Sequence, residues 1–387
     1  MQARWPLSAL ARAAALTLLC VAFAAPAHAE IIFGSEDVEE GWTFSPTGYL
    51  RVGYRHVTRD ANVDFVGRNN GFHIANARLG LLGESHDGFS FKLTVDGAVD
   101  SERGVNTPQG DIDVALRDAY LRWDFIRHIG VQVGQFDAPF TAESMRSTSR
   151  LTFIHRAVGQ EGIDAGAGLE LRGLDVSRQV GAMVSTPGVI DDGLIYWGLW
   201  AMVAAGNGAN ERFNDNNRFA FFARGQVGFL DVLTLGVSGY LNDRTEGDRP
   251  NTFVEEDRVF ALDLELLWLG FRAYGELIRQ QTRFATEGRA ERDQRAFHAQ
   301  ASYTIQTDAV HITPAYRFAT FDPFADLESD EELQGQGALQ YHTIGLALDH
   351  PHRDVRVGAN LEYTRTVEAE GQALNNDAVQ ALVRVAF

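Results

Sequence analysis

The residues of this chain that could act on a solute are positive side chains gathered in one apolar stretch. Arg146, Arg150 and Arg156 lie within residues 138–165, which also hold several bulky apolar side chains. A guanidinium group stays charged and holds its water weakly, so arginines that line a narrow passage attract anions. The sequence therefore predicts a constriction lined by these three arginines. The alternative is that they anchor the stretch to carboxylates of a surrounding wall.

No motif for covalent catalysis accompanies these arginines. His73, His298 and His342 are present and Ser302 lies near His298, but no serine stands in a G-x-S-x-G nucleophile motif. Metal-ligand spacings, phosphate loops and nucleotide fingerprints do not stand out from the rest of the sequence. We therefore expect no catalytic residue, no cofactor and no metal.

Strand-length segments of alternating polarity must position the arginines. The last segment, residues 378–387, places apolar side chains on one side and Gln380 and Arg384 on the other. A strand that separates an apolar medium from a wet one and ends on an aromatic residue resembles the closing strand of an outer-membrane β-barrel. The same alternation predicts that a second set of positive groups lines the lumen: Arg51, Arg55, Arg78, Lys92 and Arg122.

The chain holds about sixteen such segments, joined by connections that are alternately short and long. This sorting of turns and loops, and the need to pair every backbone group in lipid, predict an all-β fold: a transmembrane antiparallel β-barrel of about 16 strands. Residues 138–165 are too apolar to float in solvent, so we expect this loop to fold into the barrel and narrow it. The expected strands cover residues 47–58, 72–83, 89–99, 113–125, 130–137, 166–186, 194–206, 217–228, 233–242, 257–268, 271–282, 295–305, 310–320, 337–348, 354–366 and 377–387.

The start of the chain predicts export. Arg4 and Arg12 form a basic n-region before a short apolar core, residues 13–25, and Ala27-His28-Ala29 forms an A-x-A cleavage site. We expect residues 1–29 to be a signal peptide, residues 30–46 a short periplasmic N-terminal segment, and residues 47–387 the barrel. No later segment approaches about 18 consecutive apolar residues, so no transmembrane helix is expected.

Charge narrows the choice of partners. The formal net charge of −18 argues against a nucleic-acid partner. Lys92 is the only lysine, so nearly all positive groups are arginines. The expected partners are small anionic or hydrophilic solutes and the lipid of a bacterial outer membrane.

Several motifs resemble the phosphate-selective porin O and P family. They are residues 134–140 (GQFDAPF) and 147–156 (STSRLTFIHR), together with residues 77–80 (ARLG), 89–92 (FSFK) and 118–123 (DAYLRW). The resemblance covers about residues 76–173. It implies a sixteen-stranded, trimeric porin whose third loop folds inward, constricts the pore and carries basic residues that lead anions through it.

Two features depart from that family. The phosphate pocket of the family relies on lysines, whereas this chain has only Lys92. His155 stands where the family commonly has an acidic residue. Both departures count against a phosphate pocket like that of the family. The function that the barrel and the resemblance imply is passive diffusion of small hydrophilic solutes, with anions such as phosphate preferred.

Three other functions are compatible with a barrel. Carboxylates also face the lumen, so the channel could be a general or cation-preferring porin. A structural or adhesive barrel would have its lumen blocked and would not conduct. A barrel enzyme, such as a lipase or a protease, would need a catalytic constellation at the membrane edge.

Overall fold

A computed structural model gives the fold of the chain. It describes residues 31–33, 41–99, 113–126, 129–164, 166–190, 194–247, 252–284, 291–326, 337–351, 355–369 and 372–387. The expected signal peptide, residues 1–29, lies outside the described residues, as do residues 30 and 34–40 of the expected periplasmic segment. Residues 42–46 of that segment already belong to the first long strand. Within the described ranges, no helix is long and apolar enough to cross a membrane.

Long antiparallel strands make up most of the molecule. A short strand, β1 (Ile31–Phe33), pairs with the start of β2, and β16 (Ile305–Gln306) continues the line of β15 along β17. The long strands are β2 (Trp42–Val57), β3 (Gly71–Ser85), β4 (Phe89–Val99), β5 (Asp113–Ile126), β6 (Ile129–Asp137), β9 (Arg178–Ile190), β10 (Ile195–Ala204), β11 (Ala220–Phe229), β12 (Leu233–Glu246), β13 (Phe253–Trp268), β14 (Phe271–Phe284), β15 (Glu291–Tyr303), β17 (His311–Asp322), β18 (Leu339–Asp349), β19 (Arg356–Glu368) and β20 (Ala378–Ala386).

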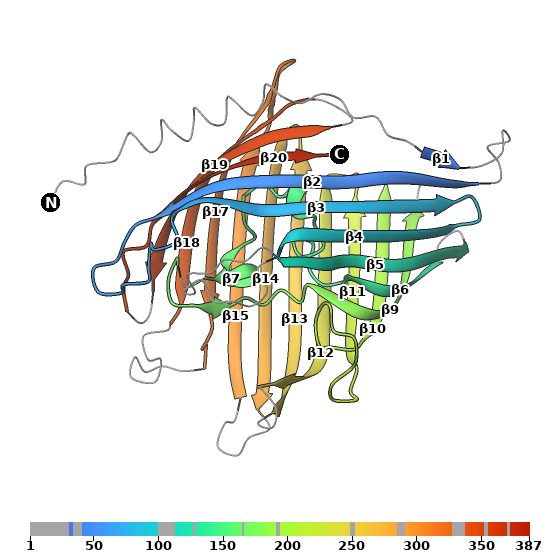
Figure 1. The fold of residues 1–387 in the computed structure, drawn as a ribbon, viewed down its shortest axis with the longest axis horizontal. Helices are drawn as coiled ribbons and strands as arrows, with labels where there is room; N and C mark the ends of the chain where they lie inside the picture. The colour runs from blue at the N-terminus through green and yellow to red at the C-terminus, as the bar shows by residue number, and fades with distance from the viewer. Residues whose placement is uncertain are drawn as a thin grey trace.

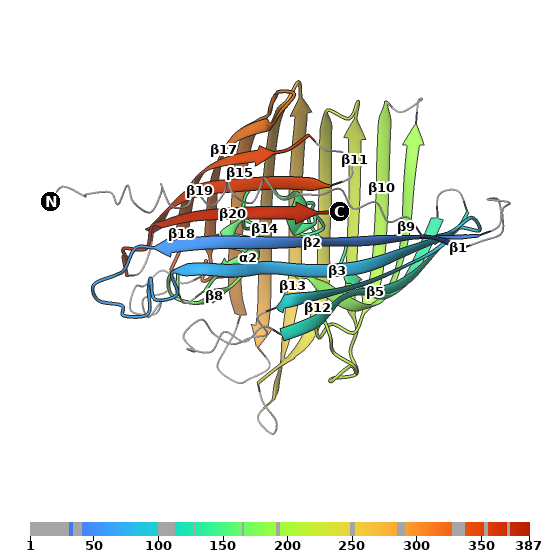
Figure 2. The same cartoon turned by 45° about the horizontal axis from the view of Figure 1, so that its top comes forward.

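These strands close into a barrel. Each long strand pairs antiparallel with its neighbour in the chain, and β2 pairs with β20, with Val52 opposite Val383. The result is a closed antiparallel barrel of 16 strands, as expected from the sequence. Figures 1 and 2 show β2, β3 and β20 side by side on one wall, with β13 and β14 on the wall behind.

The alternation of polarity explains which side of each strand faces outward. Leu79, Leu121 and Leu199 are exposed on the outer surface, whereas Arg78 and Arg224 are buried inside. Because side chains of a strand alternate between faces, every second residue meets the outer medium. The outer surface is therefore apolar and the lumen is polar.

One irregularity, a bulge in β3, changes the phase of this alternation. The pairing of β2 with β3 shifts between Arg51 and Val52, so that Ala75 has no opposite residue. Ile74 consequently faces outward and Arg78 inward, although both have even numbers. Such a bulge inserts one extra residue and reverses the facing of the side chains that follow.

The strand expected at residues 166–186 is wrong in its first part. β9 begins only at Arg178. Before it, β8 (Leu171–Arg172) pairs with β7 (Gly162–Ile163), and Gly173 approaches so closely that a Cβ there would lie 2.0 Å from the carbonyl oxygen of Gln160. The alternating apolar residues of this stretch pack under the loop instead of forming the wall.

Residues 138–177, which we call the inner loop, fold into the barrel as expected. The inner loop holds a short 3-10 helix, η2 (Thr148–Arg150), and the helix α2 (Val158–Glu161). Its Phe140, Phe153 and Leu174 are buried. α2 contacts β15 and β17 and is visible within the barrel in Figure 2. Burial of this apolar surface favours the inward position over a solvent-exposed loop.

Candidate functional site

Buried arginines of the wall hold the inner loop in place. Arg224 donates from Nη1 to the carbonyl oxygen of Phe140 over 2.7 Å, and Arg317 donates in the same way to His155 over 2.9 Å. Arg51, predicted to line the lumen, donates to the carbonyl oxygen of Ile154. Hydrogen bonds from a charged donor are stronger than neutral ones. These arginines therefore position the loop.

Arg55 also binds the inner loop. Its guanidinium forms two hydrogen bonds with the carboxylate of Asp164, and the Nη2–Oδ1 distance is 2.9 Å. Asp164 also accepts hydrogen bonds from the backbone of Gly166 and Ala167. Burial disfavours the charged carboxylate, but Arg55 outweighs it, so the pKa of Asp164 lies below its ordinary value.

His155 forms an ion pair inside the loop. Its Nδ1 lies 2.8 Å from Glu161 Oε1, and its Nε2 lies 2.9 Å from Gln380 of β20. Burial works against both charges, but their mutual attraction outweighs it. The pKa of His155 is therefore raised, and the pKa of Glu161 is lowered to about 2.

The three arginines predicted to line the constriction have different surroundings. Arg146 lies 3.1 Å from Glu265 of the wall and stacks over the ring of Tyr274. Arg156 donates to carbonyl oxygens of the loop itself, including that of Arg146 over 2.8 Å. Arg150 is exposed, and no ion pair is found for it among the described residues. Arg150 is thus the loop arginine whose charge is available to a solute.

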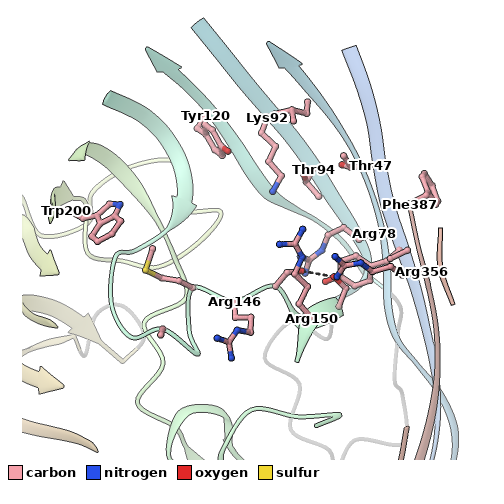
Figure 3. Close-up of a pocket in the computed structure, with 18 of the residues that line it drawn as sticks. Thr47, Arg78, Lys92, Thr94, Tyr120, Arg146, Arg150, Trp200, Arg356 and Phe387 are labelled. Atoms are coloured by element: carbon pink, nitrogen blue, oxygen red, sulfur yellow. Dashed lines mark hydrogen bonds between the residues drawn. The ribbon is translucent and has the colours of Figure 1, made fainter. Parts of the chain in front are cut away.

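A cavity of about 920 Å³ lies between the inner loop and the ends of the strands joined by short turns. We call it the turn-side chamber. Figure 3 shows Lys92 and Tyr120 entering it from the wall, and Arg146 and Arg150 from the loop. Among the described residues, Glu265 supplies its only acidic side chain, and the terminal residue, Phe387, also borders it. The positive side chains that line it are Arg78, Lys92, Arg146, Arg150, Arg224 and Arg356.

The carboxylates that pair with the wall cations lie behind them, away from this chamber. Arg78 pairs with Asp96 over 3.1 Å and Lys92 with Asp118 over 3.0 Å. Neither Asp96 nor Asp118 lines the chamber, and both are buried. The chamber therefore presents positive groups to a solute although most of them are paired within the wall.

A second cavity, of about 730 Å³, lies on the other side of the inner loop, where the long loops begin. We call it the loop-side chamber. Arg172, Arg244 and Arg292 line it, but among the described residues carboxylates outnumber them. Arg244 is bound by Glu246, Glu255 and Asp257 together. The acidic side chains that line this chamber are Glu170, Asp175, Glu211, Asp215, Glu246 and Asp257.

The predicted lumen residues thus divide into three groups. Arg78 and Lys92 line the turn-side chamber, whereas Arg51 and Arg55 hold the loop. Arg122 binds Asp124 and the hydroxyl of Ser185 within the wall. Sequence reasoning did not single out Arg224 and Arg356 as site residues. Their inward facing follows from alternation, but nothing in the sequence shows that they lie beside the inner loop.

Comparisons with known proteins bear on this arrangement. A family model described as "Phosphate-selective porin O and P" matches residues 48–255. No curated protein matches the chain.

Solved structures of outer-membrane proteins share the fold. The outer membrane channel DcaP of Acinetobacter baumannii is 13% identical, with a TM-score of 0.58 over 92% of this chain and 99% of that chain. The anion-selective porin from Comamonas acidovorans is 14% identical, with a TM-score of 0.53 over 89% and 100%. OmpT of Vibrio cholerae, in its trimer form, is 12% identical, with a TM-score of 0.55 over 89% and 99%.

Proposed function

Because the chain belongs to the phosphate-selective porin O and P family and is a channel of the bacterial outer membrane, we propose that it carries small anions, phosphate among them, by passive diffusion. The observation that carries this proposal is the lining of the turn-side chamber. In the part of the chain that the structure describes, six positive side chains line it beside one acidic side chain, Glu265. Fixed positive charges at a narrow point lower the energy of an anion and raise that of a cation.

Arg150 and Arg356 contribute most to this preference in our proposal. Both are exposed, and the described part of the chain offers neither an ion-pair partner. Arg78 and Lys92 share their charge with Asp96 and Asp118, which weakens their field at a distance. An arginine cannot lose its proton at physiological pH, so this preference would persist across the pH range of the cell envelope.

A general or cation-preferring porin is the second candidate. The carboxylates of the loop-side chamber favour it, because a ring of carboxylates attracts cations. The family and the solved porins indicate a channel and not an enzyme. We therefore propose neither a structural barrel nor a barrel enzyme.

Processing and assembly complete the proposal. Residues 1–29 would be removed on export, and the periplasmic segment expected at residues 30–46 would end at residue 41, because β2 of the barrel begins at Trp42. The likeness to OmpT of Vibrio cholerae, described in a trimer form, supports a homotrimer. The exposed apolar side chains of the outer wall, such as Leu79 and Leu121, suit contact with outer-membrane lipid.

Current through the purified, folded protein in a planar bilayer tests the phosphate preference. Phosphate added to a chloride solution should reduce the chloride current if both anions compete for the turn-side chamber. Sulfate at equal ionic strength is the control for charge alone. An unchanged chloride current would reject phosphate preference and leave a general anion pathway.

A further inference from the structure

Three side chains that could bind a metal meet where the inner loop touches the wall. They are Glu143 of the inner loop, Glu276 of β14 and His298 of β15, and one possible ligand atom of each lies within 4.8 Å of the others. All three side chains are at least 97% buried, at 2%, 3% and 3% exposure. The loop and two wall strands thus converge on one enclosed polar point.

Two buried polar atoms at this point lack a hydrogen-bond partner among the described residues. They are Nε2 of His298 and the amide oxygen of Gln160. Nε2 of His298 lies 3.6 Å from Oε2 of Glu143, and Gln160 donates from its Nε2 to Glu276. A buried imidazole nitrogen without a partner loses the hydrogen bond that water would supply, which destabilises the fold unless another group binds it.

The charges of the cluster also favour a cation. Two carboxylates cannot both remain ionised at short range in a buried position unless a positive group lies between them. The guanidinium of Arg317 lies 3.9 Å from Oε1 of Glu143. It also donates a hydrogen bond to the carbonyl oxygen of His155. Positive charge at this point is therefore less than two ionised carboxylates require, and either a proton on one of them or a bound cation would supply it.

We propose that Glu143, Glu276 and His298 bind a divalent transition-metal ion, for which zinc is the best match. An imidazole nitrogen with carboxylate oxygens suits zinc, whereas calcium and magnesium prefer oxygen ligands alone. In a tetrahedral zinc site the ligand atoms are about 3.4 Å apart, so the three side chains need only small movements. The amide oxygen of Gln160 or a water molecule would complete the site.

The ion would have a structural role. It would join the inner loop to β14 and β15 and fix the position of α2. Because binding would require the folded arrangement of loop and wall, the metal would stabilise that arrangement over one with the loop released. This inference does not depend on which solute the channel carries.

Metal content of the full chain tests the proposal. The protein is refolded into detergent with zinc present, passed over a desalting column, and its zinc is measured by elemental analysis. We expect about one zinc ion per chain in the wild type and a loss to background in Glu143→Gln and His298→Gln. Glu362→Gln is the matched control, because Glu362 is also buried and accepts a hydrogen bond from the loop at Ile154, but lies outside the cluster.

Two further measurements keep the test decisive. Migration of unheated samples on a denaturing gel shows whether each variant has folded. Cobalt bound in place of zinc in the wild type should give an absorption spectrum typical of one imidazole ligand and oxygen ligands. A wild type without bound zinc would overturn the proposal, and so would equal zinc in folded Glu143→Gln and His298→Gln or a cobalt spectrum without imidazole.

Discussion

The two chambers that the inner loop separates are built from the same residue types, but they present opposite charges. In the turn-side chamber, carboxylates such as Asp96 and Asp118 lie behind the cations they pair with. In the loop-side chamber, Glu246 and Asp257 lie beside Arg244 and line the chamber together with it. The sign of a pore lining therefore depends on which partner of each pair reaches the lumen. The net charge of −18 for the whole chain does not reveal it.

The largest expected effect on stability comes from removing a carboxylate that lies behind the cations of the turn-side chamber. In the wild type, Asp263 lies 2.6 Å from the buried Arg224. Asp263→Asn leaves this guanidinium without its carboxylate partner. We expect a loss of about 3–5 kcal/mol in the free energy of unfolding, measured by urea unfolding in detergent or lipid. The control is Asp243→Asn, which breaks the exposed pair with Arg218 and should cost about 1 kcal/mol or less. Equal losses in both variants would contradict the distinction between buried and exposed pairs.

Release of the inner loop would merge the two chambers. A Cβ on Gly159 would lie 2.2 Å from Cβ of Ala296 on β15, so Gly159→Leu cannot keep α2 against the wall. We expect a large rise in single-channel conductance, measured in planar bilayers. The control is Gly275→Ala on β14, where the nearest atom would be an ordinary 3.5 Å away. If Gly159→Leu conducted like the wild type, the inner loop would not be the constriction.

Charge reversal sharpens the contrast between the chambers. Arg150→Glu places a negative group in the turn-side chamber, and we expect it to reduce the anion-to-cation permeability ratio severalfold. Arg172→Glu makes the same change in the loop-side chamber, where Arg172 is 80% exposed and carboxylates already prevail. It should move the ratio much less. Reversal potentials of both variants in a salt gradient provide the measurement, and equal shifts would contradict the assignment.

The smallest expected effect concerns pH. The raised pKa of His155 stabilises the loop fully below the ordinary value of 6.5, and this contribution disappears as pH rises through the raised pKa. Glu161, with its pKa lowered to about 2, contributes above 4.5 and loses its contribution only in acid. His155→Gln should therefore destabilise the protein more at pH 6 than at pH 9, when unfolding is followed at both. If the loss of stability in His155→Gln were the same at both pH values, His155 would not stabilise the protein through its ion pair with Glu161.

Much of the barrel could be predicted because the residues of each strand alternate between apolar side chains, which face outward, and polar side chains, which face the lumen. The alternation of short and long connections then indicated a closed barrel with the short turns at one end and the long loops at the other. Residues 166–177 misled this reasoning, since Leu169 and Leu171, and then Leu174 and Val176, have the two-residue spacing of a strand. Leu171, Leu174 and Val176 pack within or beneath the inner loop instead. Burial in a loop and contact with lipid leave the same apolar signal.

The site could be predicted only in part, for a related reason. Alternation and the apolar loop led to Arg78, Lys92 and Arg150, which do line the turn-side chamber. Arg156 was expected beside them, but its partners are backbone carbonyl oxygens of the loop. Any residue type can supply a carbonyl oxygen, so no sequence pattern marks such an anchor.

The reversal potential of the wild-type protein in a potassium chloride gradient tests the central claim most directly. The folded protein is placed in a planar bilayer without phosphate, and the current is brought to zero at unequal salt concentrations. If the positive lining of the turn-side chamber governs permeation, chloride will cross faster than potassium. A potential of the opposite sign, with potassium faster, would show that the carboxylates of the loop-side chamber govern permeation instead.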